Sequence, residues 1–481
     1  MKVGIFNRYW STMGGGEQNA GAYAAYFAKN HDVELIGTEN FDLGRLAKIL
    51  GKPEIAELPI RVIGSHATAA TEASSDYDLF VSHSYLSDDY SLAKQSIYVC
   101  MFPQVIGKIA SSRLRARVFK ESVDQQCYLD RVVINQSSII HIESPEDDRI
   151  TFVSSGCDGV INVSAIESKE RVIDSLQTTE NPTLHALSIS KGTTILSFSP
   201  KGGDNSELVL KLDSLRQASG VRVPWGADIP LSAVDKMSFV DSYDLVLSIS
   251  KYTSDWVQTR WLTDSTIHYP AVELREWVSS SPKQKVILSV GRFFSEDYGH
   301  SKRQLQLVEA FKSLLNQGVS GWRLVLVGGC DAYSREYALN VKKAAVGFPI
   351  DVILNADHET LQEQLKSASI YWHATGLGMN LGSHPEKAEH FGIAPVEAMS
   401  AGCIPILFDH GGTAELVEDG VSGFTFQNLD DLVEKTSFLI GAESAEINVL
   451  RTATVERSQR FSKQRFDEEL GRLMATISGG K

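Results

Sequence analysis

The chain opens with an alternation of short apolar runs and longer amphipathic stretches. Residues 3–6 predict a buried strand, residues 17–28 a helix with apolar positions for packing, and residues 33–36 a second strand. The turn between the first strand and the helix contains Gly14, Gly15 and Gly16. Glycines here let the backbone of a βαβ unit approach a ligand closely, although their spacing differs from the dinucleotide fingerprint. A plain structural turn explains them equally well.

A second alternation of the same kind begins near residue 285. Its apolar runs lack polar alternation, which is typical of parallel strands covered on both faces. They lie at residues 286–290, 324–327, 351–354, 370–372 and 404–408. An amphipathic stretch at 305–315 predicts one of the helices between them, so the pattern indicates a second doubly wound α/β domain.

Between about residues 131 and 220 the pattern changes to short β-rich runs separated by polar, glycine and proline residues, as in hairpins. We interpret this segment as a module inserted into the first domain. The predicted boundaries are 1–130 and 221–278 for the first domain, 131–220 for the module, 279–455 for the second domain and 456–481 for a final amphipathic helix. The module could bind carbohydrate, select the acceptor or mediate oligomerisation, and its residues do not distinguish among these three roles.

Composition narrows the class of protein. The 481 residues exceed the size of one core, and 43% hydrophobic with 22% charged residues is ordinary for a soluble globular protein. A formal net charge of -14 argues against a general nucleic-acid binder. Five cysteines without paired ligand spacing indicate neither a disulfide framework nor a zinc site. With no signal-peptide pattern or bilayer-length apolar run, we expect a cytoplasmic protein.

The candidate chemistry lies at residues 389–399, where Glu389 and Glu397 flank a Phe-Gly pair. Pro395 suits the first position of a helix, and Gly402 suits the left-handed residue after its last turn. The amides that start a helix attract anions, and carboxylates accept hydrogen bonds from hydroxyls. The pattern therefore suggests a phosphate joined to polyols. The alternative is that both glutamates are ordinary solvated acids.

Glu389 and Glu397 are separated by seven residues that include Phe-Gly, and Glu397 opens the sequence Glu-Ala-Met-x-Ala-Gly. This pattern resembles the donor-site motif of family-four retaining glycosyltransferases (glycosyl transferases group 1). The resemblance covers nearly all of the second domain, the first domain more weakly, and not the module. It implies the GT-B fold, with two Rossmann-like domains facing a cleft and a final helix that crosses back to the first domain. It also implies sugar transfer from a nucleotide-diphosphate sugar to an acceptor hydroxyl with retention of anomeric configuration.

The resemblance also assigns residues. Arg292 and Lys302 stand where the family holds the donor pyrophosphate, and two cations suit a diphosphate. Glu389 would be the catalytic residue beside the sugar, and Glu397 would accept the ribose hydroxyls. The complete expected donor site is Arg292, Lys302, His390, Phe391, Gly392, Ile393, Ala394 and Glu397, with Gly14, Gly15 and Gly16 beside the phosphates and acceptor. Fixed cations and helix-end dipoles would stabilise the leaving group, so we expect no metal and no cofactor.

Relatives often carry a histidine at the end of a first-domain strand, where this chain has Met101. His83 is the nearest candidate by position, although a lone histidine is more often structural. Residues 108–120 carry five cations among apolar residues. They suggest peripheral contact with the inner face of an anionic membrane. The alternative is an ordinary solvated helix face, and the acidity of the whole chain favours this alternative.

The implied partners are a nucleotide-sugar donor and a glycan, lipid-linked or protein acceptor. The base and sugar of the donor stay open. Two alternatives are a phosphorylase or sugar-phosphate synthase on the same fold, and a non-catalytic GT-B-like binding protein that recruits partners through the β-rich module.

Overall fold

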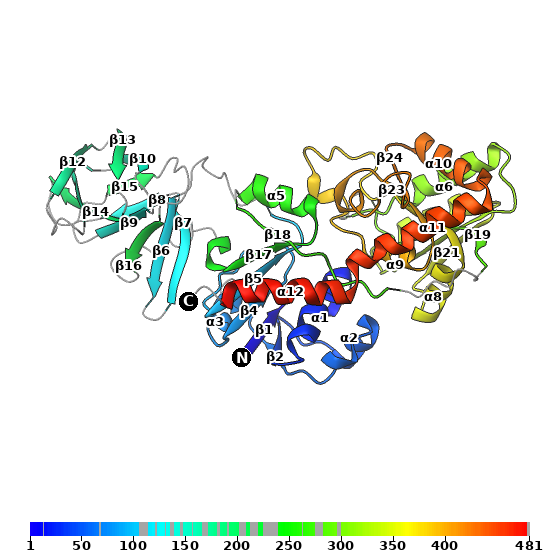
Figure 1. Ribbon diagram of the computed structural model, residues 1–481, viewed down its shortest axis with the longest axis horizontal. Coiled ribbons are helices and arrows are strands. Elements are labelled where there is room, and N and C mark those ends of the chain that lie inside the picture. Colours follow the sequence, from blue (N-terminus) through cyan, green and yellow to red (C-terminus); the bar gives the residue numbers. More distant parts are fainter. Residues whose placement is uncertain are drawn as a thin grey trace.

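The computed structural model is shown in Figure 1. It describes residues 1–12, 14–66, 69–104, 114–120, 123–129, 131–134, 139–144, 148–155, 157–165, 172–179, 183–189, 192–201, 208–211, 220–224, 239–261, 263–274, 282–295 and 300–478.

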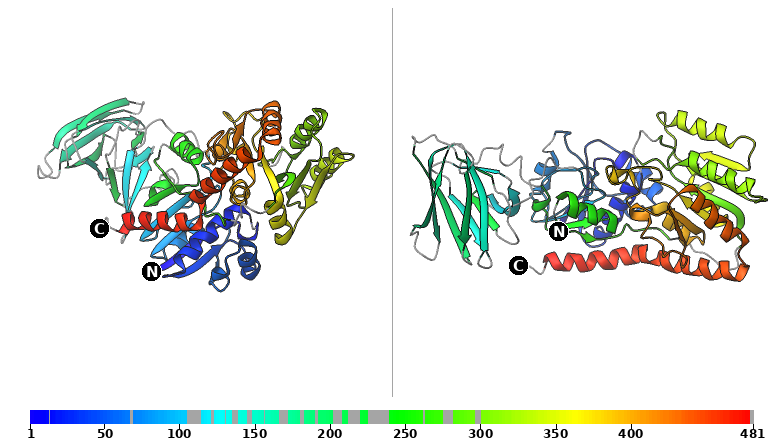
Figure 2. Two further views of the ribbon diagram at one scale, coloured as in Figure 1. Left: turned by 45° about the vertical axis from the view of Figure 1, so that its right-hand side comes forward. Right: turned by 90° about the horizontal axis from the view of Figure 1, so that it is seen from above.

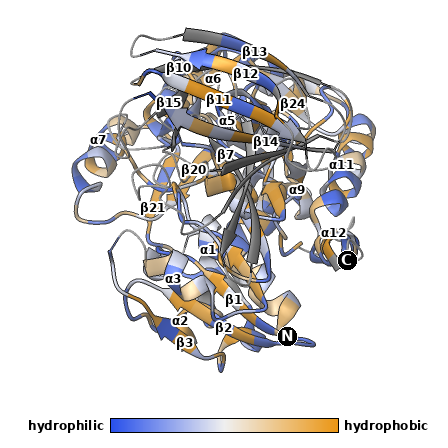
Figure 3. Cartoon of the chain, turned by 90° about the vertical axis from the view of Figure 1, so that its left-hand side faces the viewer, coloured by the Kyte–Doolittle hydropathy of each residue, from blue (hydrophilic) through white to orange (hydrophobic). Residues whose placement is uncertain are grey.

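The described residues of the first domain form a seven-stranded parallel sheet in the order β18-β17-β5-β4-β1-β2-β3. Its strands are β1 (Lys2–Phe6), β2 (Asp32–Gly37), β3 (Ile60–Val62), β4 (Leu79–Ser82), β5 (Gln95–Cys100), β17 (Leu245–Ser248) and β18 (Thr266–Ile267). Helices α1 (Gly15–Phe27), α2 (Leu43–Leu50), α3 (Ala69–Ser74) and α5 (Lys251–Trp261) accompany them. Hydrophobic colouring runs along β1 and β2 in Figure 3, as expected for strands covered on both faces.

The chain order reverses beside β1, because β1 pairs with β2 on one side and β4 on the other. Ligands of open α/β sheets bind at such a point, beyond the carboxyl ends of the strands. The loop after β1, which contains Gly14, therefore lies where the fold favours a binding site.

The second domain repeats this plan. Within residues 282–295 and 300–478 a six-stranded parallel sheet has the order β21-β20-β19-β22-β23-β24. Its strands are β19 (Gln284–Val290), β20 (Arg323–Gly328), β21 (Ile350–Leu354), β22 (Ala368–His373), β23 (Ile404–Phe408) and β24 (Phe424–Phe426). Its helices are α6 (Gln304–Asn316), α7 (Arg335–Ala345), α8 (His358–Ser367), α9 (Ile393–Ser400), α10 (Leu429–Gly441) and α11 (Ser444–Ser458). The order reverses at β19, between β20 and β22, so the segments after β19 and β22 leave the same edge side by side.

The described strands of the β-rich module form a four-stranded sheet, β13-β10-β15-β8, and a seven-stranded sheet, β12-β11-β14-β9-β16-β6-β7. Their bounds are β6 (Leu114–Lys120), β7 (Val123–Leu129), β8 (Arg131–Ile134), β9 (Ile139–Ser144), β10 (Asp148–Ser155), β11 (Gly159–Ala165), β12 (Val172–Thr178), β13 (Thr183–Ile189), β14 (Gly192–Pro200), β15 (Leu208–Lys211) and β16 (Gly220–Pro224). Figure 1 shows the module beside the first domain, on the side away from the second.

Strand pairing corrects the expected boundaries of the module. β6 and β7 pair with each other, and β16 joins β6 to β9, so all three belong to the inserted sheet. The module therefore includes strands on both sides of the expected limits of 131 and 220. Pairing between segments about a hundred residues apart leaves no local signal in the sequence. Residues 114–120 of the cationic segment form a strand, and residues 108–113 lie outside the described residues.

The end of the chain returns to the first domain. Helix α11 is followed by the single turn η7 (Gln459–Phe461) and by α12 (Lys463–Ser478), which runs along the first domain in Figures 1 and 2. The ring of Phe466 packs edge-on against Tyr23, with centroids 5.0 Å apart. The backbone oxygen of Phe466 lies 3.1 Å from Nε2 of His268. This helix fastens the second domain to the first.

Candidate active site

The loop at Glu389 and the start of α9 form the centre of the site. Gly392 precedes the helix with a φ of 110°, and a Cβ there would approach Thr413 Cγ2 to 3.0 Å, so glycine suits the position. The helix begins at Ile393, which corrects the expected start at Pro395. Glu397 therefore stands in the second turn, not the first. Gly402, with a φ of 80°, follows the helix in the left-handed conformation, as predicted.

The turn at Gly412, after β23, packs against the backbone of the loop at Glu389 and His390. The amide of Gly412 donates to the backbone oxygen of Glu389 at 2.7 Å. A Cβ at Gly412 would lie 2.1 Å from the backbone oxygen of His390, which leaves room only for glycine. Backbone contact with the segment after β23 thus fixes the conformation of the loop.

Glu389 meets two nitrogen atoms. Lys302 Nζ lies 2.5 Å and His373 Nε2 lies 2.9 Å from its Oε2 atom, and 17% of the side chain is exposed. Burial by itself raises the pKa of Glu389, but the charge of Lys302 and the hydrogen bond from His373 outweigh it. They hold that pKa well below its usual range. The residue is therefore a carboxylate and accepts hydrogen bonds.

Glu397 lies near the same part of the sheet. Burial raises the pKa of the Tyr371 hydroxyl well above its usual value, and the negative charges of Glu389 and Glu397 add to the rise. Both carboxylates are thus close enough to the Tyr371 hydroxyl, near the carboxyl ends of the second sheet, to raise its pKa. The structure brings the two glutamates of the motif into one neighbourhood.

Arg292 reaches across to the first domain. Its Nη2 atom donates to the backbone oxygen of Thr12 at 3.2 Å. A Cβ built on Gly14 would come within 2.5 Å of the same nitrogen, and one built on Gly15 within 3.4 Å of Ile393 Cδ1. The glycine loop therefore faces Arg292 and the start of α9 at close range. The predicted residues of the two domains meet in one interdomain site.

Sequence reasoning missed the group that shapes the glycine loop. Glu17 is buried, and its Oε2 atom accepts from the amide of Gly14 and from Thr12 Oγ1, both at 2.7 Å. Asn7 Nδ2 donates to Oε1 of Glu17 at 3.3 Å. A glutamate three residues after the N-cap residue supplies one half of a capping box, because its side chain accepts from the N-cap amide, so the spacing of Gly14 and Glu17 could have revealed this role.

Met101 lies beside the glycine loop, and His83 lies beside α1, the helix that follows this loop. A Cβ on Gly16 would be 3.0 Å from the sulfur of Met101. His83 is fully buried, with Nε2 2.9 Å from Asn19 Nδ2 and its ring against Tyr23. Burial lowers the pKa of His83 to about 4. No hydrogen-bond partner for the buried Nδ1 atom of His83 is found among the described residues.

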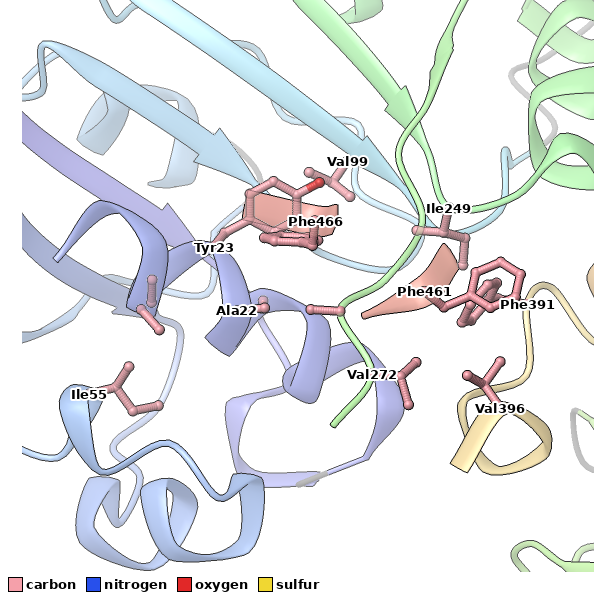
Figure 4. Packing of buried hydrophobic residues seen from close by; sticks show 14 of the residues in the cluster. Ala22, Tyr23, Ile55, Val99, Ile249, Val272, Phe391, Val396, Phe461 and Phe466 are labelled. Atoms are coloured by element: carbon pink, nitrogen blue, oxygen red, sulfur yellow. The ribbon is translucent and has the colours of Figure 1, made fainter. Parts of the chain in front are cut away.

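The side chains of His390 and Phe391 point toward the first domain. The imidazole of His390 stacks on the ring of Phe102, with centroids 4.3 Å apart. Burial and the nearby His300 hold the pKa of His390 well below its usual range. Phe391 is buried against Tyr269 and Phe461, at centroid distances of 5.9 and 5.4 Å (Figure 4). These ring contacts bury both side chains, and the stack of His390 on Phe102 joins the two domains.

A cavity of about 420 Å³ opens near the carboxyl ends of β20 and β21. It is lined by Cys330, Asp331, Ala332, Arg335, Leu339, Lys342, Leu354 and Asn355. The charge of Arg292 contributes to the lowered pKa of Asp331, after hydrogen bonds from Ser334, so the cavity lies close to the arginine. Among the described residues, no cluster of three or more His, Cys, Asp or Glu is arranged to hold a metal ion.

Two Rossmann-like domains that meet at such a site define the GT-B class, and solved structures share the arrangement. HepE from Anabaena, in complex with UDP and glucose, has a TM-score of 0.55 at 12% identity, covering 99% of this chain and 100% of that chain. Sucrose-phosphate synthase from Thermosynechococcus elongatus has a TM-score of 0.53 at 13% identity, covering 100% of both chains. The predicted GT-B fold is confirmed, and at these identities the likeness speaks for the fold alone.

Residues 273–449 match the family described as glycosyl transferases group 1, so the chain carries a domain of that family. The mouse enzyme GDP-Man:Man(3)GlcNAc(2)-PP-Dol alpha-1,2-mannosyltransferase is 24% identical over 245 residues, 47% of this chain and 46% of its own length. A GDP-mannose:cellobiosyl-diphosphopolyprenol alpha-mannosyltransferase of Komagataeibacter xylinus is 26% identical over 209 residues, 43% of this chain and 48% of its own. The chain thus spans about half the length of these relatives.

Proposed function

We propose that this protein transfers a sugar from a nucleoside-diphosphate sugar to an acceptor hydroxyl. The observation that carries the proposal is the convergence of Arg292, Lys302 and Glu389 with the amide end of α9 and the glycine loop of the other domain. Cations and helix-end amides suit a diphosphate, and a carboxylate suits sugar hydroxyls. A site with both features suits an activated sugar.

The diphosphate would lie between Arg292, Lys302 and the amides from Gly392 to Ala394. As the bond from the anomeric carbon to the diphosphate breaks, charge accumulates on the leaving oxygen. Preorganised cations and N–H dipoles stabilise that charge because they need no reorientation during the reaction. We propose that this replaces a metal ion and that the reaction uses no cofactor.

Retention of anomeric configuration is part of the proposal. The acceptor oxygen would bond to the anomeric carbon on the face from which the diphosphate departs, and a diphosphate oxygen would take the acceptor proton. Glu389, held as a carboxylate, would accept a hydrogen bond from a sugar hydroxyl, and Glu397 would accept from the ribose. No enzyme nucleophile is required in this scheme.

We further propose a mannosyl donor, GDP-mannose, and a glycan acceptor carried on a lipid diphosphate. The relatives named above support this, because each uses GDP-mannose and a polyprenol- or dolichol-linked diphosphate acceptor according to its name. In the described residues, no helix combines the length and the apolar character needed to cross a bilayer. A peripheral position at the cytoplasmic face of a membrane would bring the protein to such an acceptor.

Nucleotide release should be measured with UDP-, GDP- and ADP-sugars, each with and without a polyprenyl-diphosphate oligosaccharide. The proposal expects acceptor-dependent release of GDP from GDP-mannose. NMR of the early product should show the anomeric configuration of the donor. Release with a phosphorylated sugar as the only productive acceptor would instead indicate a sugar-phosphate synthase.

A second candidate is a non-catalytic protein that binds nucleotide sugars or glycans and recruits partners, or copies of itself, through the β-rich module. Two observations favour it: Met101 stands beside the glycine loop where relatives often carry a histidine, and the module forms sheets of its own. Saturable binding of GDP-mannose with no turnover across the donor and acceptor panel would support this candidate.

A further inference from the structure

Two donors converge on a single oxygen of Glu389. Lys302 Nζ and His373 Nε2 both contact Oε2, at 2.5 and 2.9 Å. The other carboxylate oxygen, Oε1, therefore remains for a hydrogen bond from a third group. The two donors come from different parts of the second domain, since Lys302 lies on the segment before α6 and His373 is the last residue of β22.

His373 acts here as a neutral donor. It is buried, and burial lowers its pKa, although the Glu389 carboxylate opposes the effect. A carboxylate oxygen only accepts, so the hydrogen of the neutral ring must be on Nε2, pointing at Glu389. Thr375 Oγ1 also lies 2.9 Å from this nitrogen.

Lys302 and His373 should respond differently to a bound diphosphate, because they differ in charge and in flexibility. Lys302 is a point charge on a flexible stem, and a diphosphate carries more negative charge than the single carboxylate it now meets. His373 is a rigid ring enclosed by the second domain, with no charge to offer a phosphate. Donor binding would thus draw Lys302 away from Glu389 and leave the contact with His373 intact.

We propose that His373 is a positioning residue, which keeps the Glu389 carboxylate in place while Lys302 transfers from Glu389 to the donor diphosphate. This inference rests on the proposed function, because it assigns a role within the same site. In the absence of donor, the ion pair with Lys302 occupies the carboxylate. In its presence, Oε2 stays bonded to His373 and Oε1 accepts a sugar hydroxyl.

Other titratable groups also face Glu389. His300 and His390 each have one ring nitrogen at a backbone oxygen, Ala388 O at 3.1 Å and Glu386 O at 3.2 Å respectively. Tyr371 has its hydroxyl 3.3 Å from the backbone oxygen of Val290. The negative charges of Glu397 and Glu389 both raise the pKa of that hydroxyl.

The test compares His373→Gln with His373→Phe. The glutamine amide places an N–H donor near the position of Nε2, whereas phenylalanine keeps the ring shape without a donor. We expect His373→Phe to lower kcat by about 10²-fold, the effect of a small displacement of a catalytic group, with the donor KM changed little. His373→Gln should retain kcat within about fivefold of wild type, since one neutral donor replaces another. His358→Gln, on the exposed start of α8, is the control.

The pH dependence of kcat separates positioning from a structural role. Loss of a hydrogen bond to a carboxylate favours its protonated form, so the acidic limb should move to higher pH in His373→Phe and not in His373→Gln. Equal losses of kcat in both variants with unmoved acidic limbs would overturn the proposal. Wild-type kcat and an unmoved limb in His373→Phe would overturn it as well.

A measurement without turnover distinguishes this inference from the proposed function. The carboxylate of Glu389, labelled with carbon-13 and assigned through Glu389→Gln, can be titrated by NMR with GDP bound. A higher pKa in His373→Phe than in wild type supports the positioning role even if no sugar is transferred, and an unchanged pKa contradicts it. Absence of transfer by the wild type would count against the proposed function alone.

Discussion

The imidazole of His390 lies almost parallel to the ring of Phe102, with an angle of 13° between the planes and 4.3 Å between the centroids. One ring belongs to the second domain and the other to the first. Arg260 supports the stack, because it contacts the Phe102 ring at 5.2 Å and pairs with Glu386 at 3.2 Å. This aromatic pair is therefore a second contact between the two domains, in addition to the hydrogen bond from Arg292 to Thr12.

Removal of the Phe102 ring should loosen the domain contact. Phe102 is buried, and truncation of a buried phenylalanine to alanine costs about 3–5 kcal/mol where the surroundings cannot collapse. We expect Phe102→Ala to raise the radius of gyration in small-angle scattering and to lower kcat/KM, since site residues from both domains separate. Phe438→Ala, at a side chain that is 51% exposed, is the control. An unchanged radius with unchanged kcat/KM would show that the stack does not hold the domains.

The two cations proposed to bind the diphosphate, Arg292 and Lys302, give a second prediction. Arg292→Ala and Lys302→Ala should each lower kcat by about 10²–10³-fold, the loss found when one fixed donor to a developing negative charge is removed. Thermal unfolding of Arg292→Ala should match wild type, because Arg292 is exposed. Arg323→Ala is a suitable control, since Arg323 starts β20 at the opposite edge of the sheet and pairs with Asp351. Wild-type turnover in the Arg292 and Lys302 variants would remove the basis of the proposed function.

Two glycine substitutions should fail in different ways. A Cβ at Gly14 meets the mobile end of the Arg292 side chain, which can move aside, so Gly14→Ala should lower kcat/KM without lowering the melting temperature. A Cβ at Gly412 meets backbone, which cannot move aside cheaply, so Gly412→Ala should lower the melting temperature. Differential scanning calorimetry and steady-state kinetics on both variants check this. Equal melting temperatures in the two would contradict the packing argument.

Buried histidines predict acid sensitivity. Burial lowers the pKa of His83 and of His268 to about 4, against an unfolded value of 6.5. As the pH falls below 6.5, the unfolded chain binds protons that the folded chain does not. The free energy of unfolding should therefore decrease by up to about 1.4 kcal/mol per pH unit for each histidine. His268→Gln should flatten this slope between pH 6.5 and 4 in denaturant titrations, and an unchanged slope would contradict the prediction.

The local pattern of apolar residues was sufficient to predict several strands of the fold. The apolar run at 286–290 lies within β19, and that at 404–408 coincides with β23, because a strand covered on both faces must be apolar along its length. The resemblance to the family's donor-site motif pointed to the two glutamates and to the cations after β19, which lie near one another in the structure. Their meeting in one site follows from the reversal of strand order at β19.

Tertiary contacts explain what the sequence could not reveal. Helix α9 starts two residues before Pro395 because Gly392 adopts a left-handed conformation and Gly412, from a distant turn, packs against the loop. His373 sits at the end of an apolar strand, with no local sign that its ring meets a carboxylate sixteen residues later. The cap formed by Glu17 is the exception, because its spacing from Gly14 was visible in the sequence.

The return of α12 has a consequence for how the chain is completed during synthesis. The Tyr23 face is covered by Phe466 near the other end of the sequence, whereas the second sheet, from β19 to β24, is encoded without interruption. Domains fold as units once their residues have left the ribosome. The half translated later can thus become a finished globule first, while the earlier half keeps an apolar surface uncovered until the final helix emerges.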